Sequence, residues 1–237
     1  MTIREDSVVA HDVNQHVRGG SIPASSLHFW HDEHRFAQDL VERFHYSRRW
    51  PSNVQSVTVA HVAGGLFGNK GDAVGAVVFT IPGTRWRFPV WELARLVRAD
   101  APIALSALVA AGVRRCRKQG GHLLVSFADR THGHHGGIYQ ACGWAYAGLR
   151  KPARDAVIHN GVLVPCRTAN HKWGSNSPKR LAERGIIVEP HYDDGKHLYW
   201  LALTPTGATW AQTLGLAKQS YPKRTAAVPS WFERGED

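Results

Sequence analysis

The sequence predicts an α/β protein built on a mixed sheet, and three observations lead to this class. An apolar run at 123–128 is followed by a polar loop, a short helical segment and a second apolar run at 144–149. Residues 100–118 carry apolar side chains at helical spacing, and residues 54–62 and 73–81 have the pattern of strands. Because helices alternate with strands along the chain, we expect helices packed on a sheet.

The N-terminal part predicts one helix and three strands. Residues 1–26 show no sustained periodicity and are expected to form a flexible arm. A helix follows from Asp32, with its apolar stripe at Phe36, Leu40, Val41 and Phe44, and it ends before Pro51. Strands are predicted at 54–62 and 73–81, on either side of a glycine-rich loop at 64–71, and a longer third strand at 85–97 is interrupted by Pro89.

The clearest helix spans 100–118. Asp100 is the predicted N-cap, Pro102 lies in the first turn, and Gly120 ends the helix. Its last turn holds the cations of residues 114–118, which the helix dipole favours. A strand at 123–128, a helix at 137–142 and a strand at 144–149 complete the predicted core, which spans 27–150.

Residues 151–217 predict a C-terminal extension packed on this core. Asn160-Gly161 is a strong two-residue turn signal and predicts a hairpin over 157–164. Ser177-Pro178 begins a short helix, and 186–188 is expected to pair with 197–203. Residues 218–237 hold Pro222 and Pro229 and are predicted to be a loose tail.

Composition excludes several classes. No apolar run reaches the ~18 residues that a membrane span needs, and the polar N-terminus lacks the apolar segment of a signal peptide. The three cysteines form no CxxC pair, so we expect reduced thiols and a cytoplasmic protein rather than a disulfide framework.

The charge of the chain points to an anionic partner. There are 29 Lys and Arg against 19 Asp and Glu, for a net charge of +10. The basic residues are spread along the chain, which predicts a surface assembled in three dimensions rather than a basic tail. The chain has nine tryptophans, and Trp30, Trp50, Trp86 and Trp173 each have a basic residue within five positions. This composition is typical of grooves that stack unpaired bases, and core packing is the alternative for each.

The loop after the strand at 123–128 is the best candidate for a site. Within eleven residues it holds a carboxylate, three imidazoles, two adjacent glycines and a phenol: Asp129, His132, His134, His135, Gly136, Gly137 and Tyr139. Open α/β sheets build their sites in such loops, and this density of titratable groups is hard to explain by packing. A purely structural loop would use Gly136-Gly137 only to turn.

The same segment, SFADRTHGHHGGIYQACGWAYAG at 126–148, resembles the Mom family, the DNA adenine-modification proteins of Mu-like phages. That family is a divergent branch of the GNAT acyltransferase superfamily. The motifs FHYSR at 44–48 and WELARL at 91–96 occur in the order that the family shows, and the resemblance covers about 30–203. It implies a GNAT-like fold with a small C-terminal extension, in which a mixed sheet splays beside its middle strands.

The resemblance implies a transferase that adds a carbamoylmethyl-type group to adenine N6 in double-stranded DNA. Such an enzyme acts in the bacterial cytoplasm on phage or prophage DNA and protects it from restriction. Two alternatives remain open: a GNAT-type N-acyltransferase acting on a protein or small-molecule amine, and a basic DNA-binding protein without catalysis. Adenine N6 is a poor nucleophile and is paired inside a duplex, so its modification requires a proton acceptor, close positioning and access to a flipped base.

Site residues follow from the motifs. We expect catalytic roles at Asp129 as base or adenine acceptor, at Tyr139 as the acid that protonates a departing thiolate, and at His135, His45, Tyr46 and Ser47. Each has a structural alternative, such as loop capping for Asp129 and packing for Tyr139. Glu92 and Arg95 either form a buried pair or face the cleft. Substrate contacts are expected from Ser126, Arg95, Arg48, Gly136, Gly137, Trp144 and Tyr146.

The sequence says less about the donor of the transferred group and about a metal ion than about the site residues. GNAT enzymes bind coenzyme A through a glycine-containing loop, but residues 98–103 here read RADAPI, with Arg98 alone retained. We therefore expect an acyl or aminoacyl donor, with acetyl-CoA possible but not held in the usual manner. His134 and His135 are candidate ligands for a metal such as iron. The stretch at 165–168 lacks a histidine that the family leads us to expect near Arg167.

Overall fold

The structure is a computed structural model that describes residues 22–63, 70–83, 85–100 and 102–223. Its centre is a seven-stranded sheet in the order β1-β2-β3-β4-β5-β10-β6. In that order the strands are β1 (Leu27–His31), β2 (Val54–Ala63), β3 (Lys70–Thr80), β4 (Trp91–Arg98), β5 (Leu123–Asp129), β10 (Lys196–Ala202) and β6 (Ala145–Arg150). Neighbours are antiparallel except β4 and β5, which run parallel.

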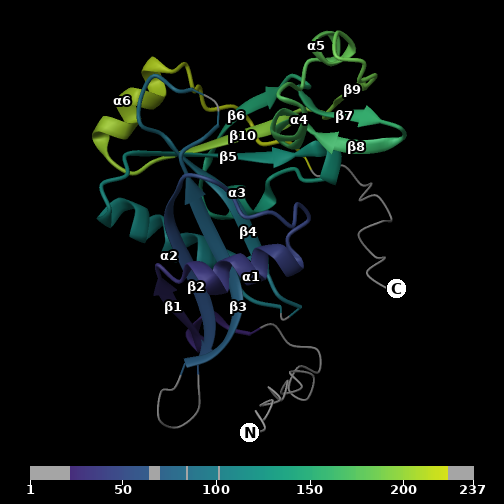
Figure 1. Ribbon diagram of the computed structural model, residues 1–237. Helices are drawn as coiled ribbons and strands as arrows, with labels where there is room; N and C mark the ends of the chain where they lie inside the picture. Colours follow the sequence, from purple (N-terminus) through teal and green to yellow (C-terminus); the bar gives the residue numbers. More distant parts are fainter. Residues whose placement is uncertain (1–21, 64–69, 84, 101, 224–237) are drawn as a thin grey trace, which may run out of the picture.

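Helices cover both faces of this sheet (Figure 1). Side chains alternate along β3, so Val77 and Phe79 pack toward α2 (Leu105–Lys118), whereas Ala76 and Val78 pack toward α1 (His34–Phe44). α3 (Gly137–Ala141) lies on the α2 side, and α6 (Pro205–Thr213) covers β5 and β10 on the α1 side. The sheet therefore has an α1/α6 face and an α2/α3 face.

The parallel strands β4 and β5 are paired only where they begin, at Trp91–Leu124 and Glu92–Val125. Beyond these pairs the strands separate, and Ser126 Oγ donates to the carbonyl of Leu93 across the opening at 2.9 Å. A mixed sheet splayed between its middle strands is the GNAT-like architecture that the sequence predicted, so that prediction is confirmed.

A β-bulge at Ala94 changes which way β4 presents its side chains. Leu93 pairs with Phe79 and Arg95 with the adjacent Val78, so Ala94 is the extra residue. Without the bulge, Glu92 and Arg95 would point to opposite faces; with it, both lie on the α1/α6 face.

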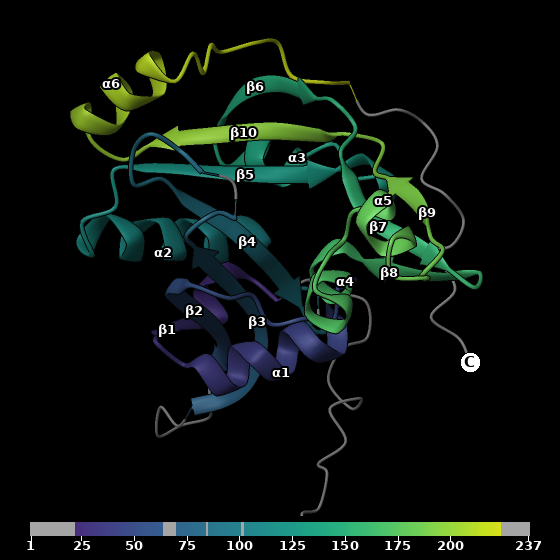
Figure 2. The ribbon, with the colours of Figure 1, turned by 45° about the horizontal axis from the view of Figure 1, so that its top comes forward.

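A second, three-stranded sheet in the order β8-β7-β9 stands beside the main one (Figures 1 and 2). Its elements are β7 (Arg154–His159), β8 (Val162–Pro165), α4 (Cys166–Trp173), α5 (Pro178–Ala182) and β9 (Glu189–Tyr192). Asn160 and Gly161 have φ angles of 50° and 76°, as a two-residue turn with positive φ requires, so the predicted hairpin is confirmed. We call residues 151–192 the side domain.

Several predicted elements differ from the structure. β10 was expected to pair with 186–188 in the extension, but it lies between β5 and β6, and α6 packs beside it. The main sheet thus includes chain beyond the expected boundary at 150. Residues 85–90 form no strand, and α2 begins at Leu105 with Ala104 as N-cap rather than Asp100, because Pro102 and Ile103 stay extended and pair with Ile22.

The two ends of the described chain also contact the sheet. Of the expected arm, residues 1–21 lie outside the described residues, as do 64–69 and 224–237. Within the expected tail, Gln219 pairs with Tyr146, and the Tyr221 hydroxyl donates to the Trp144 carbonyl at 2.8 Å. No helix in the described part of the chain is long and apolar enough to cross a bilayer.

Candidate active site

The predicted site residues divide between the two faces of the sheet. One set of side chains, from β4, β5 and the loop after α1, gathers on the α1/α6 face. This group, which we call the cleft, contains His45, Tyr46, Ser47, Arg95 and Asp129. The α2/α3 face holds Ser126, Tyr139, Trp144 and Tyr146, which pack in or beside the core under α2 and α3. The splay between β4 and β5 is the place where the two sets meet.

Asp129 ends β5 and is 8% exposed. One carboxylate oxygen accepts the Thr131 amide at 3.0 Å, and the other lies 3.2 Å from Lys196 Nζ. Lys196 also reaches Asp193 at 3.3 Å. Sequence reasoning missed Lys196, because its place opposite Asp129 depends on β10 pairing with β5.

Tyr46 lies in the cleft between imidazole rings. Its ring centroid is 4.3 Å from that of His45 and 4.1 Å from that of His132, and His134 meets it edge-on at 5.5 Å. The Tyr46 side chain is half exposed. Burial and the carboxylate of Asp129 raise the pKa of Tyr46, opposed by the cation of Arg95.

His45 is buried and neutral. Its Nδ1 accepts from Ser47, from the backbone amide at 3.1 Å and from the hydroxyl at 2.8 Å, which places the imidazole proton on Nε2. Burial, with the nearby charge of Arg95, lowers the pKa of His45 to about 3. Ser47 therefore fixes the ring and tautomer of His45.

Glu92 and Arg95 both face the cleft because of the bulge between them. Arg95 donates to the carbonyls of Arg49 at 3.1 Å and Ala94 at 2.7 Å, which anchors the loop after α1 to β4. Burial raises the pKa of Glu92 and lowers that of Arg95. The charge of Arg167, on α4, acts on both, so the side domain contributes to the field of this cleft.

On the other face, Ser126 connects Tyr139 to the splay. The Ser126 hydroxyl donates to the Leu93 carbonyl, and the two hydroxyls of Ser126 and Tyr139 are 2.7 Å apart. Because a carbonyl only accepts, Tyr139 is the donor to Ser126. Burial raises the pKa of Tyr139, with further increases from Tyr46 and Glu92 on the opposite face.

The glycines of the loop shape the start of α3. Gly136 has a φ of 80°, and a side chain there would collide with the ring of Tyr199. The Tyr199 hydroxyl donates to the His135 carbonyl at 2.6 Å and accepts from Gln140 at 3.0 Å. Tyr199 and Gln140, both missed in the sequence, hold this loop in place.

Three other predicted substrate-binding residues lie either in the core or on the surface. Trp144 is fully buried, and Tyr146 is buried with its hydroxyl 2.8 Å from His197 Nδ1. Arg48 is exposed on the turn after α1 and has a φ of 44°.

The expected metal ligands do not converge. His134 contacts Tyr46 and His132, while the His135 carbonyl faces Tyr199. Among the described residues, no three His, Cys, Asp or Glu side chains form a group suited to a metal ion. Metal binding by His134 and His135 therefore gains no support from the donor set and stays a prediction.

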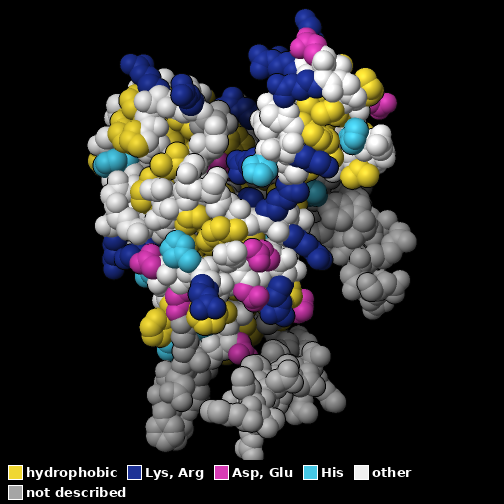
Figure 3. Space-filling model, in the orientation of Figure 1, with side chains coloured by type: hydrophobic (Ala, Val, Ile, Leu, Met, Phe, Trp, Pro, Cys, Tyr) yellow, Lys and Arg dark blue, Asp and Glu magenta, His cyan; other side chains and the backbone are white. Residues whose placement is uncertain are grey.

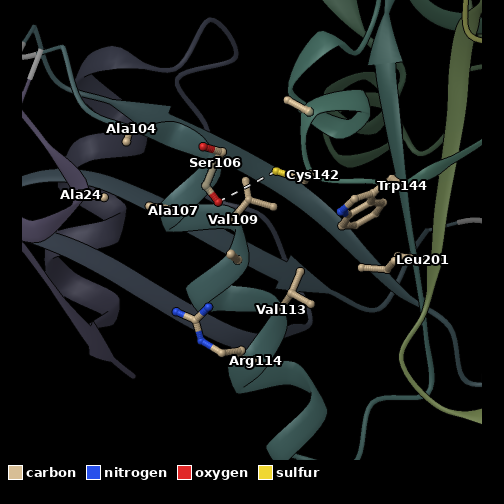
Figure 4. A pocket seen from close by; sticks show the side chains of 12 residues that line it. Ala24, Ala104, Ser106, Ala107, Val109, Val113, Arg114, Cys142, Trp144 and Leu201 are labelled. Atoms are coloured by element: carbon tan, nitrogen blue, oxygen red, sulfur yellow. Dashed lines mark hydrogen bonds between the residues drawn. The ribbon is translucent and has the colours of Figure 1, made fainter.

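The α2/α3 face has room for a donor. A cavity of about 500 Å³ lies between α2 and α3, with mostly apolar walls that include Val109, Val113 and Leu201, and with Arg114 at one end (Figure 4). Cys142 Sγ is 4.0 Å from the Ser106 carbonyl, where α3 meets the start of α2. These walls fit an apolar arm, but the segment before α2 has no glycine and offers no ordinary pyrophosphate cradle.

Comparisons with solved structures find acetyltransferases. An acetyltransferase from Bacillus subtilis in complex with CoA is 12% identical, with 75% of this chain and 98% of that chain covered and a TM-score of 0.44. A GNAT family acetyltransferase from Elizabethkingia anophelis with acetyl-CoA bound is 10% identical, with 75% and 99% covered and a TM-score of 0.42. A spermidine/spermine N-acetyltransferase from Vibrio cholerae is 10% identical, with 82% and 99% covered and a TM-score of 0.43.

Identities this low say nothing about substrate or donor. No curated protein matches the chain. The model of the Mom protein family, in contrast, matches residues 27–223, which include the cleft, the splay and the side domain. This chain belongs to the Mom protein family.

Proposed function

We propose that the protein is a transferase that adds a carbamoylmethyl-type group to N6 of adenine in double-stranded DNA. We further propose that it acts in the bacterial cytoplasm on phage or prophage DNA and protects that DNA from restriction. The observation that carries the proposal is the splay, where a carboxylate and a phenol flanked by imidazole rings on one face meet a buried phenol on the other. Membership of the Mom family supports adenine as the acceptor.

The α1/α6 face is suited to receive the adenine. A base flipped out of the duplex needs an aromatic surface and a polar edge, which Tyr46, His132 and the Asp129 carboxylate supply. Asp129 is fixed by Thr131 and Lys196 but keeps acceptor capacity, because each carboxylate oxygen can take more than one hydrogen bond. We assign to Asp129 the acceptance of a hydrogen bond, and then of a proton, from the N6 amino group.

The α2/α3 face is suited to the donor. In the transfer, N6 bonds to the electrophilic carbon of the donor as the bond from that carbon to its leaving group breaks. The N6 proton passes to Asp129, and the leaving group takes a proton from Tyr139. The raised pKa of Tyr139 keeps the phenol protonated at neutral pH, as an acid requires. When bound, the donor would supply the electrophilic carbon, which for a carbamoylmethyl product is a methylene carbon rather than an acyl carbon. The apolar walls between α2 and α3 would hold the arm of this donor.

Charge supports DNA as the partner. Figure 3 shows Lys, Arg and His side chains in the hollow between the two upper lobes of the molecule, on the α1/α6 face. Arg48 is exposed beside the cleft, and Arg167 of the side domain acts on Glu92 and Arg95. With a net charge of +10, such a surface favours phosphates over other partners.

Nucleoside mass spectrometry of DNA from cells that express the chain tests this proposal. A modified deoxyadenosine of increased mass is the expected result. Unmodified deoxyadenosine with acylated protein or polyamine would favour an ordinary N-acyltransferase. Unmodified DNA and unmodified amines, with DNA binding retained, would favour a binding protein without catalysis.

A further inference from the structure

A second pocket lies on the α1/α6 face, away from the cleft. It measures about 370 Å³ and is lined by Ile81, Pro82 and residues 85–91, between β3 and β4. We call it the pocket at 81–91. Its lining is aromatic, cationic and aliphatic, and includes Arg85, Trp86, Arg87 and Phe88. The proposed function gives this pocket no role.

Rings and charges alternate along this segment. Arg85 and Arg87 are exposed, whereas Trp86 and Phe88 are half-buried between them. Trp86 packs against the cluster of Val90, Leu123 and Val125, and the Phe88 ring is stacked on Trp210 of α6 at 5.2 Å and 1°. The two rings thus lie beside two exposed cations, of which Arg87 is placed over the Phe88 ring at 5.5 Å. An aromatic ring with neighbouring cations suits a nucleobase and its phosphate.

The pocket lies close enough to the cleft for one DNA strand to reach both. Trp86 packs in one cluster with Val125, and Val125 and Asp129 share a face of β5. Four residues of strand separate them, or about 13 Å at ~3.3 Å per residue. That spans roughly four nucleotides of a duplex strand, at ~3.4 Å each. The same segment also leads directly into Glu92.

We propose that the pocket at 81–91 binds one nucleotide of the DNA strand that carries the target adenine. The base contacts the ring of Trp86, and the flanking phosphates contact Arg85 and Arg87. This inference rests on the proposed function, because it takes DNA as the substrate. Stacking tolerates every base, so the pocket adds affinity and holds the strand but reads no sequence.

Photocrosslinking tests the contact directly. A single-stranded oligonucleotide containing 5-bromodeoxyuridine is irradiated with the full-length protein, and the crosslinked peptides are mapped by mass spectrometry. We expect an adduct within residues 85–91, lost on competition with unmodified oligonucleotide. Adducts found only elsewhere would overturn the proposal. The readout is binding, so it remains decisive even if no adenine is modified.

Affinity measurements test the base contact with a matched control. We compare an oligothymidylate with one of equal length in which alternate bases are replaced by abasic sites. The wild type should lose about fivefold or more in affinity, the loss of one stacked base. Trp86→Leu, checked for folding by circular dichroism, should lose much less, whereas Phe36→Leu, a change at an exposed aromatic residue of α1, should behave as wild type. If Trp86→Leu and the wild type lost the same affinity on replacement of the bases by abasic sites, the proposal would be contradicted.

The arginines give a second variant that keeps the fold. Arg85→Gln/Arg87→Gln changes two exposed side chains and should reduce the salt slope of single-strand binding by about 1.4, for two phosphates at ~0.7 each. An unchanged salt slope would show that Arg85 and Arg87 do not contact the phosphates. If free adenosine diphosphate quenched Trp86 fluorescence while oligonucleotides did not, the pocket would serve a free nucleotide, and the proposal of a DNA subsite would be wrong.

Discussion

At the residue scale, the two tyrosines of the site differ in exposure. The enclosed Tyr139 is suited to the donor, and the half-exposed Tyr46 is suited to the adenine. Tyr139 is enclosed by Trp144, Tyr199 and Ser126, whereas Tyr46 presents a half-exposed ring among imidazoles. Tyr139→Phe keeps the ring contacts and removes only the acid. We expect the rate of modification to fall about a hundredfold or more, the lower side of acid–base effects, with the far-ultraviolet circular dichroism unchanged.

Ser126→Ala is the matched change for Tyr139→Phe, because it removes the partner of the phenol and leaves the acid. Its rate should exceed that of Tyr139→Phe. A Tyr139→Phe protein as fast as wild type in a single-turnover assay would show that the phenol only packs, the alternative that its surroundings also allow.

The neutral His45 predicts how stability depends on pH. Its pKa of about 3 lies below the ~6.5 of an unfolded histidine, so between these values the unfolded chain binds a proton that the folded chain does not. The free energy of unfolding should therefore fall as the pH is lowered from about 6.5 toward 3. His45 contributes at most about 1.4 kcal/mol per pH unit.

Urea unfolding at pH 7 and pH 5 measures this contribution. His45→Gln should lose less stability than the wild type between these values. A parallel loss in the two proteins would mean that His45 is protonated in the folded state, and the assignment of its tautomer would fall with it.

At the scale of elements, local sequence patterns predicted most of the sheet but not its order. β2, β3, β5, α2 and α3 lie within a few residues of their predicted ranges, because each carries a clear periodicity. β10 was recognised as a strand but given the wrong partner. Its neighbours β5 and β6 lie about fifty residues or more before it, and pairing over such separations leaves no local signal.

The loop that begins α3 depends on one glycine. Gly136 has a positive φ, and a methyl group there meets the rigid ring of Tyr199. Gly143, at the other end of α3, has a φ of 72° but open space around it. Gly143→Ala should cost about 1 kcal/mol in unfolding free energy for the left-handed conformation alone. Gly136→Ala should cost about 2 kcal/mol or more and also lower activity. If urea unfolding gave equal losses of unfolding free energy for the two variants, the Tyr199 ring would move aside at no cost.

At the scale of the whole molecule, the sequence found the site motifs but not their division between two faces. Asp129 and Tyr139 were expected in one loop. The structure places them on opposite faces of the sheet, on either side of the splay. The roles of Lys196 and Arg167 were missed, because both reach the cleft through tertiary contacts. The orientation of Glu92 was left open, because it depends on a bulge that the sequence does not reveal.

The distribution of charge predicts which face binds DNA. Arg48 is exposed beside the cleft, whereas Arg117 is exposed on α2, which packs on the opposite face. Arg48→Gln should weaken duplex binding and reduce its salt slope by about 0.9, the contribution of one phosphate contact. Arg117→Gln should change neither. Fluorescence anisotropy at several salt concentrations measures both, and equal effects would indicate binding by overall charge rather than by the cleft face.

The most direct test of the central claim measures deoxyadenosine in DNA from cells that express the wild type, Asp129→Asn or Asp194→Asn. Asn keeps the acceptor for the Thr131 amide but cannot take the N6 proton, whereas Asp194 is an exposed carboxylate nearby. We predict a modified deoxyadenosine with the wild type and with Asp194→Asn, and at least about a hundredfold less with Asp129→Asn at equal protein level. Modification by Asp129→Asn at the wild-type level would contradict the account and place the chemistry outside this cleft.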